Sequence, residues 1–239
     1  MQPVYVDIMT PDQQRVSTVC KFPTRGNRAP AESVINEWIG CFSAKLIGLQ
    51  APECFIVDAS PHVQLHLVEK HGVNVSSQFG FASRVSQIDS IIYPSTLARM
   101  DPEDLARLFC FDVLFINADR IPNNPNCGHS QKRLFTFDFG SALVSPGTSP
   151  NSFDKFFFGP ALNDRVSAHL CREFVLSPEL AESVINDIID RLGASRWYAS
   201  LRAGFLPQAL QDHLSLVVRY IDYICKERNM ICHQIVNTI

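Results

Sequence analysis

Three polar side chains in two short segments have the chemical types and the spacing that phosphoryl transfer needs. Asp119 lies in a polar loop at residues 117–126 and is separated by four residues from Asn124. Asp138 follows and opens an Asp-Phe-Gly tripeptide. In-line phosphoryl transfer needs a carboxylate at the attacking hydroxyl, and magnesium prefers hard oxygen ligands such as an amide and a second carboxylate. The pattern therefore predicts Asp119 as a catalytic base and Asn124 and Asp138 as magnesium ligands.

Each of these segments is joined to an apolar element that can hold it in place. Residues 108–116 are almost wholly apolar and end at the polar loop, which predicts a buried helix there. Residues 134–137 are predicted to form a buried strand that delivers Asp138. Asn, Asp and Pro are also frequent in turns, so an ordinary surface loop is the alternative for either segment alone. The two segments in this order are typical of the catalytic and metal-binding loops of protein kinases.

The first third of the chain supplies the other groups that such a site requires. Residues 16–22 alternate between polar and apolar types, which predicts a strand with Lys21 near its end. A kinase carries its phosphate-binding lysine in this position, although a solvated lysine is the alternative. A helix is predicted from about residue 30 to residue 46. Its Glu37 lies at the margin of the apolar stripe and can orient Lys21, whereas Glu32 in the first turn suits the helix dipole.

Several segments resemble the HipA-like kinase family, and in particular a small single-domain branch of it. The resemblance covers roughly residues 14–145. The segments that carry it are Asn36-Glu37, Ala44-Lys45-Leu46-Ile47-Gly48-Leu49, Pro52, Phe55-Ile56-Val57 and the N-x-D-R-…-N-P-N loop from Asn117 to Asn126. The resemblance implies ATP and Mg²⁺ as cofactors. It also implies that Lys21 contacts the phosphates of the nucleotide and that Glu37 holds Lys21.

The resemblance further implies a bacterial serine/threonine kinase with a protein substrate. Characterised HipA-like kinases are often toxins of toxin–antitoxin pairs, and several autophosphorylate. For this chain we therefore expect autophosphorylation and an antitoxin-like partner. Neither expectation follows from composition or spacing.

Two departures from the family pattern keep other functions open. The turn at residues 9–14, which precedes Lys21, contains no glycine and so cannot serve as a Gly-rich phosphate loop. Ile121 stands where many relatives carry His after Asp-Arg, which leaves the orientation of the loop open. Both favour a nucleotide-binding pseudokinase or interaction module. A lipid or small-molecule kinase is the second alternative, because lipid kinases share these motifs, but the chain has no basic membrane patch.

The predicted elements describe an α+β, protein-kinase-like fold with two lobes in a single domain of residues 1–239. We expect a small, reduced N-lobe sheet at about 1–75, a hinge at about 76–95 and a mainly helical C-lobe at about 96–239. Residues 62–69 alternate and are predicted to form a strand of the N-lobe. Helices are predicted to begin at Asp101-Pro102, Ser177-Pro178 and Leu206-Pro207. The phenylalanines of residues 145–163 are expected to pack locally.

Composition narrows the class of protein. A chain of 239 residues with 46% hydrophobic and 19% charged residues is typical of a compact globular protein. The net charge of −3 and the lack of a basic run argue against direct nucleic-acid binding. Eight cysteines without a CxxC pair predict reduced thiols in a cytoplasmic protein, and Cys225, Cys232 and His233 fit no zinc template. No signal-peptide pattern or membrane-spanning run is seen in the sequence.

Overall fold

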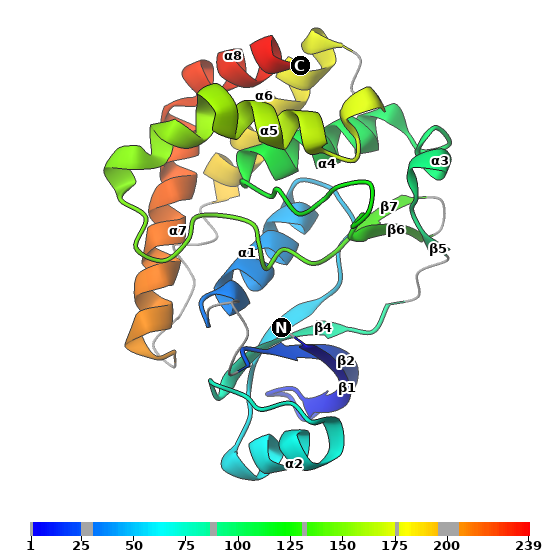
Figure 1. The fold of residues 1–239 in the computed structure, drawn as a ribbon, viewed down its shortest axis with the longest axis vertical. Coiled ribbons are helices and arrows are strands. Elements are labelled where there is room, and N and C mark those ends of the chain that lie inside the picture. Colours follow the sequence, from blue (N-terminus) through cyan, green and yellow to red (C-terminus); the bar gives the residue numbers. More distant parts are fainter. Residues whose placement is uncertain (1, 25–30, 87–89, 131–132, 175–176, 196–205) are drawn as a thin grey trace.

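The structure, a computed structural model, describes residues 2–24, 31–86, 90–130, 133–174, 177–195 and 206–239. A small sheet-rich part lies below a larger helical part (Figure 1). The cleft between them contains two cavities, and Pro3, Lys21 and Asp138 line both of them. The sheet-rich part contains β1 (Gln2–Met9), β2 (Arg15–Phe22), β3 (Cys54–Asp58), α2 (Pro61–His71) and β4 (Phe79–Arg84). The helical part contains α1 (Ser33–Leu46), β5 (Ser90–Ile91), α3 (Pro94–Leu97), α4 (Pro102–Leu114), β6 (Cys127–Ser130), β7 (Arg133–Thr136), the 3₁₀-helices η1 (Pro150–Phe157) and η2 (Arg172–Phe174), α5 (Gly159–Ala168), α6 (Pro178–Ser195), α7 (Gln208–Lys226) and α8 (Arg228–Thr238). The predicted α+β class, with a small sheet and a mainly helical remainder, is confirmed.

The sheet of the smaller part is antiparallel, in the order β1-β2-β4-β3. Alternate residues of β2 are buried, as its sequence predicts, because a strand points successive side chains to opposite faces. One face of the sheet packs against α2, whose Leu67 lies in a small hydrophobic core with Cys20. The other face turns towards the cleft and carries Lys21, which pairs with Pro3 of β1 and Phe81 of β4. β4 occupies part of the range predicted as a hinge.

Residues 62–69 form part of helix α2, so the predicted strand is wrong. The Ser60 hydroxyl accepts a hydrogen bond from the first turn of α2, and Gly72 ends the helix at a φ of 64°. These signals at the two ends outweigh a short alternation of apolar residues. The alternation of apolar residues did not reflect a buried face, because Leu67 is the one residue of this helix that is buried.

Helix α4 lies at the centre of the helical part and leads directly into the polar loop. Its residues from Leu108 to Leu114 are all fully buried, which confirms the predicted buried helix. The Asp101 carboxylate caps its start by accepting a hydrogen bond from the Glu103 amide at 2.9 Å. Helices α6 and α7 also begin where their Ser-Pro and Leu-Pro signals predict. Within the described ranges, no helix combines the length and apolar character needed to span a membrane.

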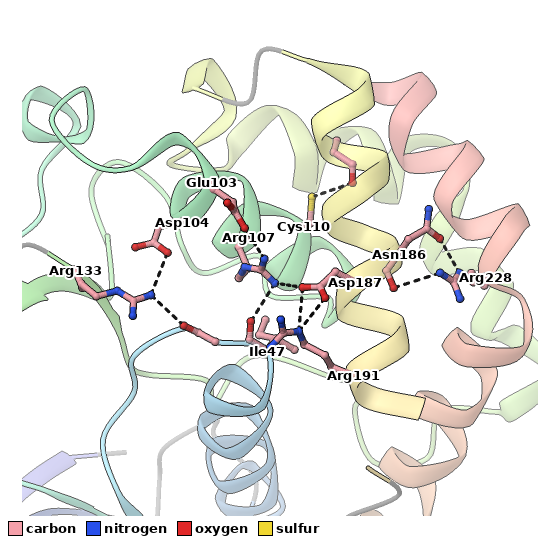
Figure 2. A network of polar contacts seen from close by, with 12 residues as sticks. Ile47, Glu103, Asp104, Arg107, Cys110, Arg133, Asn186, Asp187, Arg191 and Arg228 are labelled. Carbon is pink, nitrogen blue, oxygen red and sulfur yellow. Dashed lines mark hydrogen bonds and ion pairs between the residues drawn. The ribbon is translucent and has the colours of Figure 1, made fainter. Parts of the chain in front are cut away.

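A polar network fastens α1 to the helices of the larger part (Figure 2). Arg107 of α4 donates to the carbonyl of Ile47, just beyond α1, at 3.1 Å, and it also pairs with Asp187 of α6. Nearby, Arg228 joins α8 to α6, because its Nε atom donates to the Asn186 side-chain oxygen at 2.6 Å. Because α1 also shares the large hydrophobic core of these helices, its side chains are placed by the helical part.

The phenylalanine-rich segment packs on α7. Phe153 and Phe157 are buried, and their rings lie 5.2 and 6.3 Å from the ring of Tyr220. Phe158 is 42% exposed. The expected packing is therefore confirmed for Phe153 and Phe157 of η1.

Candidate active site

Lys21, Glu37 and Asp138 meet at the centre of the cleft, although they come from β2, α1 and the segment after β7. The Lys21 Nζ atom lies 2.5 Å from Glu37 Oε1 and 2.7 Å from Asp138 Oδ1. Glu37 is fully buried, whereas the Asp138 side chain is 39% exposed. The predicted Lys21–Glu37 pair is thus formed. Glu32, the competing acid, lies at the start of α1 and its side chain makes no capping hydrogen bond.

The charges of these three groups are strongly linked. Burial alone lowers the pKa of Lys21, but the negative charges of Glu37 and Asp138 raise it above its ordinary value. Burial raises the pKa of Glu37 to about 7, even though Lys21 opposes this shift. Burial also opposes ionisation of Asp138, but the charge and hydrogen bond of Lys21 lower its pKa below the usual range. Asp138 is therefore the more readily ionised of the two carboxyl groups.

Glu37 also fixes the Asp-Phe-Gly segment. Its Oε2 atom accepts a hydrogen bond from the Phe139 backbone N–H at 2.8 Å. Helix α1 approaches so closely that a Cβ atom added at Gly40 would lie 2.4 Å from Phe139 Cβ. Asp138 itself adopts a φ of 62°, a left-handed conformation that is uncommon for residues other than glycine. The close packing therefore holds the Asp138 backbone in a strained conformation.

The loop at residues 117–126 is held by hydrogen bonds between its own residues. The Asp119 backbone N–H donates to the Asn117 side-chain oxygen at 3.3 Å. The Asn124 side-chain amide donates to the Asp119 carbonyl at 3.1 Å, and that of Asn126 reaches Asp119 Oδ2 at 3.5 Å. Asn124 therefore stabilises the loop with its NH₂ group, and its amide oxygen is the atom type that magnesium takes.

The sequence patterns did not identify the residue that anchors this loop, Asp112 of α4. Its carboxylate is fully buried and accepts hydrogen bonds from Asn117, Arg120 and His169. Burial opposes its ionisation, but the Arg120 charge and the hydrogen bonds from His169 and Arg120 lower the pKa of Asp112 below its usual value. The orientation left open by Ile121 is therefore supplied by other side chains. An acid inside the otherwise apolar run of residues 108–116 is the sequence signal that could have identified Asp112.

Two cavities meet at Lys21 and Asp138. The first, of about 350 Å³, lies under the sheet and is lined mainly by apolar and aromatic side chains, including Tyr5, Phe81 and Phe137. The second, of about 520 Å³, is more polar. It brings Asp119 together with Lys21, Glu37 and Asp138. Asn124 lines neither cavity.

Comparison with known proteins assigns the family. A sequence model described as HipA-like kinase matches residues 20–216. The chain belongs to the HipA-like kinase family. The match extends well beyond the predicted limit near residue 145 and reaches into α7. No curated protein sequence matches the chain.

A solved structure shows the same fold. The proinflammatory kinase CtkA of Helicobacter pylori has a TM-score of 0.57 to this HipA-like kinase at 13% sequence identity. The similarity covers 98% of this chain and 91% of CtkA. Family and fold together support a kinase-type phosphotransferase, and the family implies that it uses ATP.

The cleft of this HipA-like kinase fits a nucleotide and a divalent cation. The apolar first cavity suits a base, and the adjacent Lys21 ammonium suits phosphates. In the part of the chain that is described, no three His, Cys, Asp or Glu residues form a metal site. Magnesium in such sites usually takes only one or two carboxylates together with phosphate oxygens and water. The partly exposed Asp138 carboxylate meets that requirement.

The turn at residues 9–14 lies away from Lys21. In the β1–β2 hairpin, Met9 pairs with Arg15, whereas Pro3 pairs with Lys21 at the opposite end. Pro3 lines both cavities. The part of β1 that adjoins the site is therefore its beginning, and the glycine-free turn lies at the other end of the hairpin.

Proposed function

We propose that this protein transfers the γ-phosphoryl group of ATP, with magnesium, to a serine or threonine hydroxyl of a protein. The observation that supports the proposal is the meeting of Lys21, Glu37, Asp138 and Asp119 around one polar cavity. Asp119 would accept the proton of the attacking hydroxyl, and Lys21, held by Glu37, would neutralise phosphate charge. Asn124 and Asp138 would hold magnesium, which supplies charge neutralisation at the phosphates.

Family analogy extends the proposal to regulation. We infer an autophosphorylating, toxin-type bacterial kinase that acts in the cytoplasm and is restrained by an antitoxin-like partner. The acceptor protein is not specified by the fold, because phosphoryl transfer needs only a positioned hydroxyl.

The test uses γ-labelled ATP and magnesium with the purified protein and with Asp138→Ala. Asp58→Ala is the matched control, since Asp58, at the end of β3, is another solvent-accessible aspartate near a strand end but lines neither cavity of the site. We expect label on the wild type and on the control, and none on Asp138→Ala. Label that persists in Asp138→Ala would contradict the proposed role of that carboxylate.

Nucleotide binding without transfer is the second candidate. The observation that favours it is that Lys21 holds the Asp138 carboxylate directly, at 2.7 Å. In that case no label would appear, but ATP and magnesium would raise the melting temperature of the wild type and not of Asp138→Ala. Absence of both label and thermal shift would rule out both candidates.

A further inference from the structure

We propose that His169 is a positioning residue for the catalytic loop, acting through Asp112. It follows α5, far downstream of the loop in the sequence, and its ring lies against the buried end of α4. His169 lines neither cavity, so it does not touch a bound nucleotide or acceptor there. Its role rests on the proposed function, because that function makes Asp119 the base.

Asp112 binds three side chains at once. Its Oδ1 atom accepts from Asn117 Nδ2 at 2.8 Å, and its Oδ2 atom accepts from Arg120 Nε at 2.5 Å. His169 Nε2 lies 3.0 Å from the same Oδ2 atom. The side chains of Asp112, Arg120 and His169 are at most 1% exposed, so water does not replace any lost donor. Asn117 and Arg120 flank Asp119 on either side, and both depend on the orientation of one carboxylate.

The hydrogen bonds of His169 fix its role as a donor. The backbone N–H of Cys171 donates to His169 Nδ1 at 3.0 Å, so this nitrogen carries no hydrogen. The ring hydrogen is therefore on Nε2 and points to Asp112. The next residue, Leu170, donates its backbone N–H to the Arg120 carbonyl at 3.0 Å. The segment that contains His169 is thus bonded both to the anchor and to the loop.

Arg120 connects the Asp112 carboxylate to the far end of the loop and to Phe139. Its Nη1 atom donates to the carbonyls of Pro125 and Asn126 at the far end of the loop. Its guanidinium also lies over the ring of Phe139, 5.4 Å from the ring centre. Loss of the His169 donor would leave the Oδ2 atom of Asp112 held by Arg120 alone, which loosens the orientation of the carboxylate. The loop and the Asp-Phe-Gly segment would then both lose their fixed geometry.

The test compares His169→Leu with His169→Gln. Glutamine can place an N–H donor near the position of Nε2, whereas leucine cannot donate. Tyr220→Phe is the matched control, because it removes another buried hydrogen bond to α4, from the Tyr220 hydroxyl to the Leu114 carbonyl at 2.8 Å, without touching Asp112. If His169→Leu does not fold, His169→Asn, which is polar but too short to reach Asp112, takes its place.

Hydrogen exchange of the loop peptide is measured first. We expect amides of residues 117–126 to exchange about tenfold faster in His169→Leu, and at the wild-type rate in His169→Gln and Tyr220→Phe. Phosphoryl transfer should fall about 100-fold in His169→Leu and recover largely in His169→Gln, because a small displacement of a catalytic group is costly. Affinity for ATP should change less than about twofold, since His169 does not line the nucleotide cavity.

Unchanged loop exchange in His169→Leu would overturn the role of His169. Equal effects of the leucine and glutamine variants would overturn it too, because a merely structural loss would not be rescued by a donor. If the wild type transfers no phosphate, the proposed function fails. The exchange comparison would then still decide whether His169 holds the loop.

Discussion

The two sides of the cleft are built differently. On the helical side, Glu37 and Asp112 are fully buried, and each carboxylate is held by more than one donor. On the sheet side, Tyr5 is 76% exposed, and the Asp7–Arg15 ion pair lies at the surface. The difference indicates that the geometry of transfer is fixed by the core of the helical part. We expect the affinity for the nucleotide, in contrast, to depend on exposed side chains of β1 such as Tyr5.

Lys21 joins the two sides. It belongs to the sheet, which has its own small hydrophobic core, but both of its carboxylate partners belong to the larger part. Movement of the sheet relative to the helices would therefore break the contacts of Lys21 before it disturbed the loop at residues 117–126.

We expect the largest difference in the free energy of unfolding between a variant that breaks a buried ion pair and one that breaks an exposed ion pair. Asp112→Asn leaves the buried Arg120 without its counter-ion, and we expect the free energy of unfolding to fall by about 3–5 kcal/mol. Asp7→Asn removes the exposed partner of Arg15 and should cause no measurable change. Urea denaturation of the two variants measures both effects. Similar losses in the two variants would contradict the contrast between the sides.

The next largest effect on stability is expected at Gly40, which packs tightly against Phe139. Gly40→Ala would place a methyl group against Phe139, and we expect a loss of about 1–3 kcal/mol of stability, together with weaker transfer. Gly193→Ala is the control, because its Cβ would lie 3.7 Å from Cys225 Sγ, an ordinary contact, in another helix. Alanine favours a helix over glycine, so Gly193→Ala should stabilise the protein slightly. Thermal unfolding in which both variants shift the same way would count against the close packing of α1 on Phe139.

The parts of this arrangement that could be predicted are those with local signals. β2 alternates, Asp101-Pro102 marks a helix start, and the Asp-Phe-Gly tripeptide follows the strand β7 that was predicted before it. These patterns predicted Lys21 in the smaller, sheet-containing part and Asp138 in the helical part. α2 was missed because a short alternation resembled a strand, and its capping residues decided the outcome.

The parts that could not be predicted depend on contacts between distant residues. Asp112 and His169 are 57 residues apart, and no spacing in the sequence indicates that α5 returns to the end of α4. The family match also reaches residue 216, and residues of α6 and of the start of α7 lie in the large hydrophobic core. Their apolar stripes are common to many helices and so carried no family signal.

Glu37 is predicted to make stability depend on pH. Its pKa is raised from 4.5 to about 7 in the folded protein, so the folded state binds a proton more tightly than the unfolded chain. The stability that this proton contributes is complete below about pH 4.5 and is lost as the pH rises through about 7. Relative to Glu37→Gln, which stays neutral, the wild type should lose stability over this window. Urea denaturation of both proteins between pH 5 and about 8 tests the sign.

A difference between wild type and Glu37→Gln that stayed constant across this window would contradict the prediction. A difference that grew in favour of the wild type would mean that the ion pair with Lys21 outweighs the burial of Glu37. The expected sign implies instead that Glu37 orients Lys21 at a cost in stability, as is common for buried ion pairs.

The smallest effect, on the affinity for ATP, is expected from a change at Tyr5 on the sheet side of the cleft. Its ring lines the apolar cavity, where a base can stack on it, and Tyr5→Ala should weaken ATP binding about tenfold. Tyr5→Phe should bind normally, and so should Met9→Ala, which truncates an exposed side chain on the same face at the far end of β1. Calorimetric titration with ATP and magnesium measures affinity, and single-turnover transfer at saturating ATP measures the chemical step. A side chain that only binds the nucleotide changes affinity and leaves the chemical step unchanged. If Tyr5→Ala slowed the chemical step as well, the sheet side would also help to position the reacting groups.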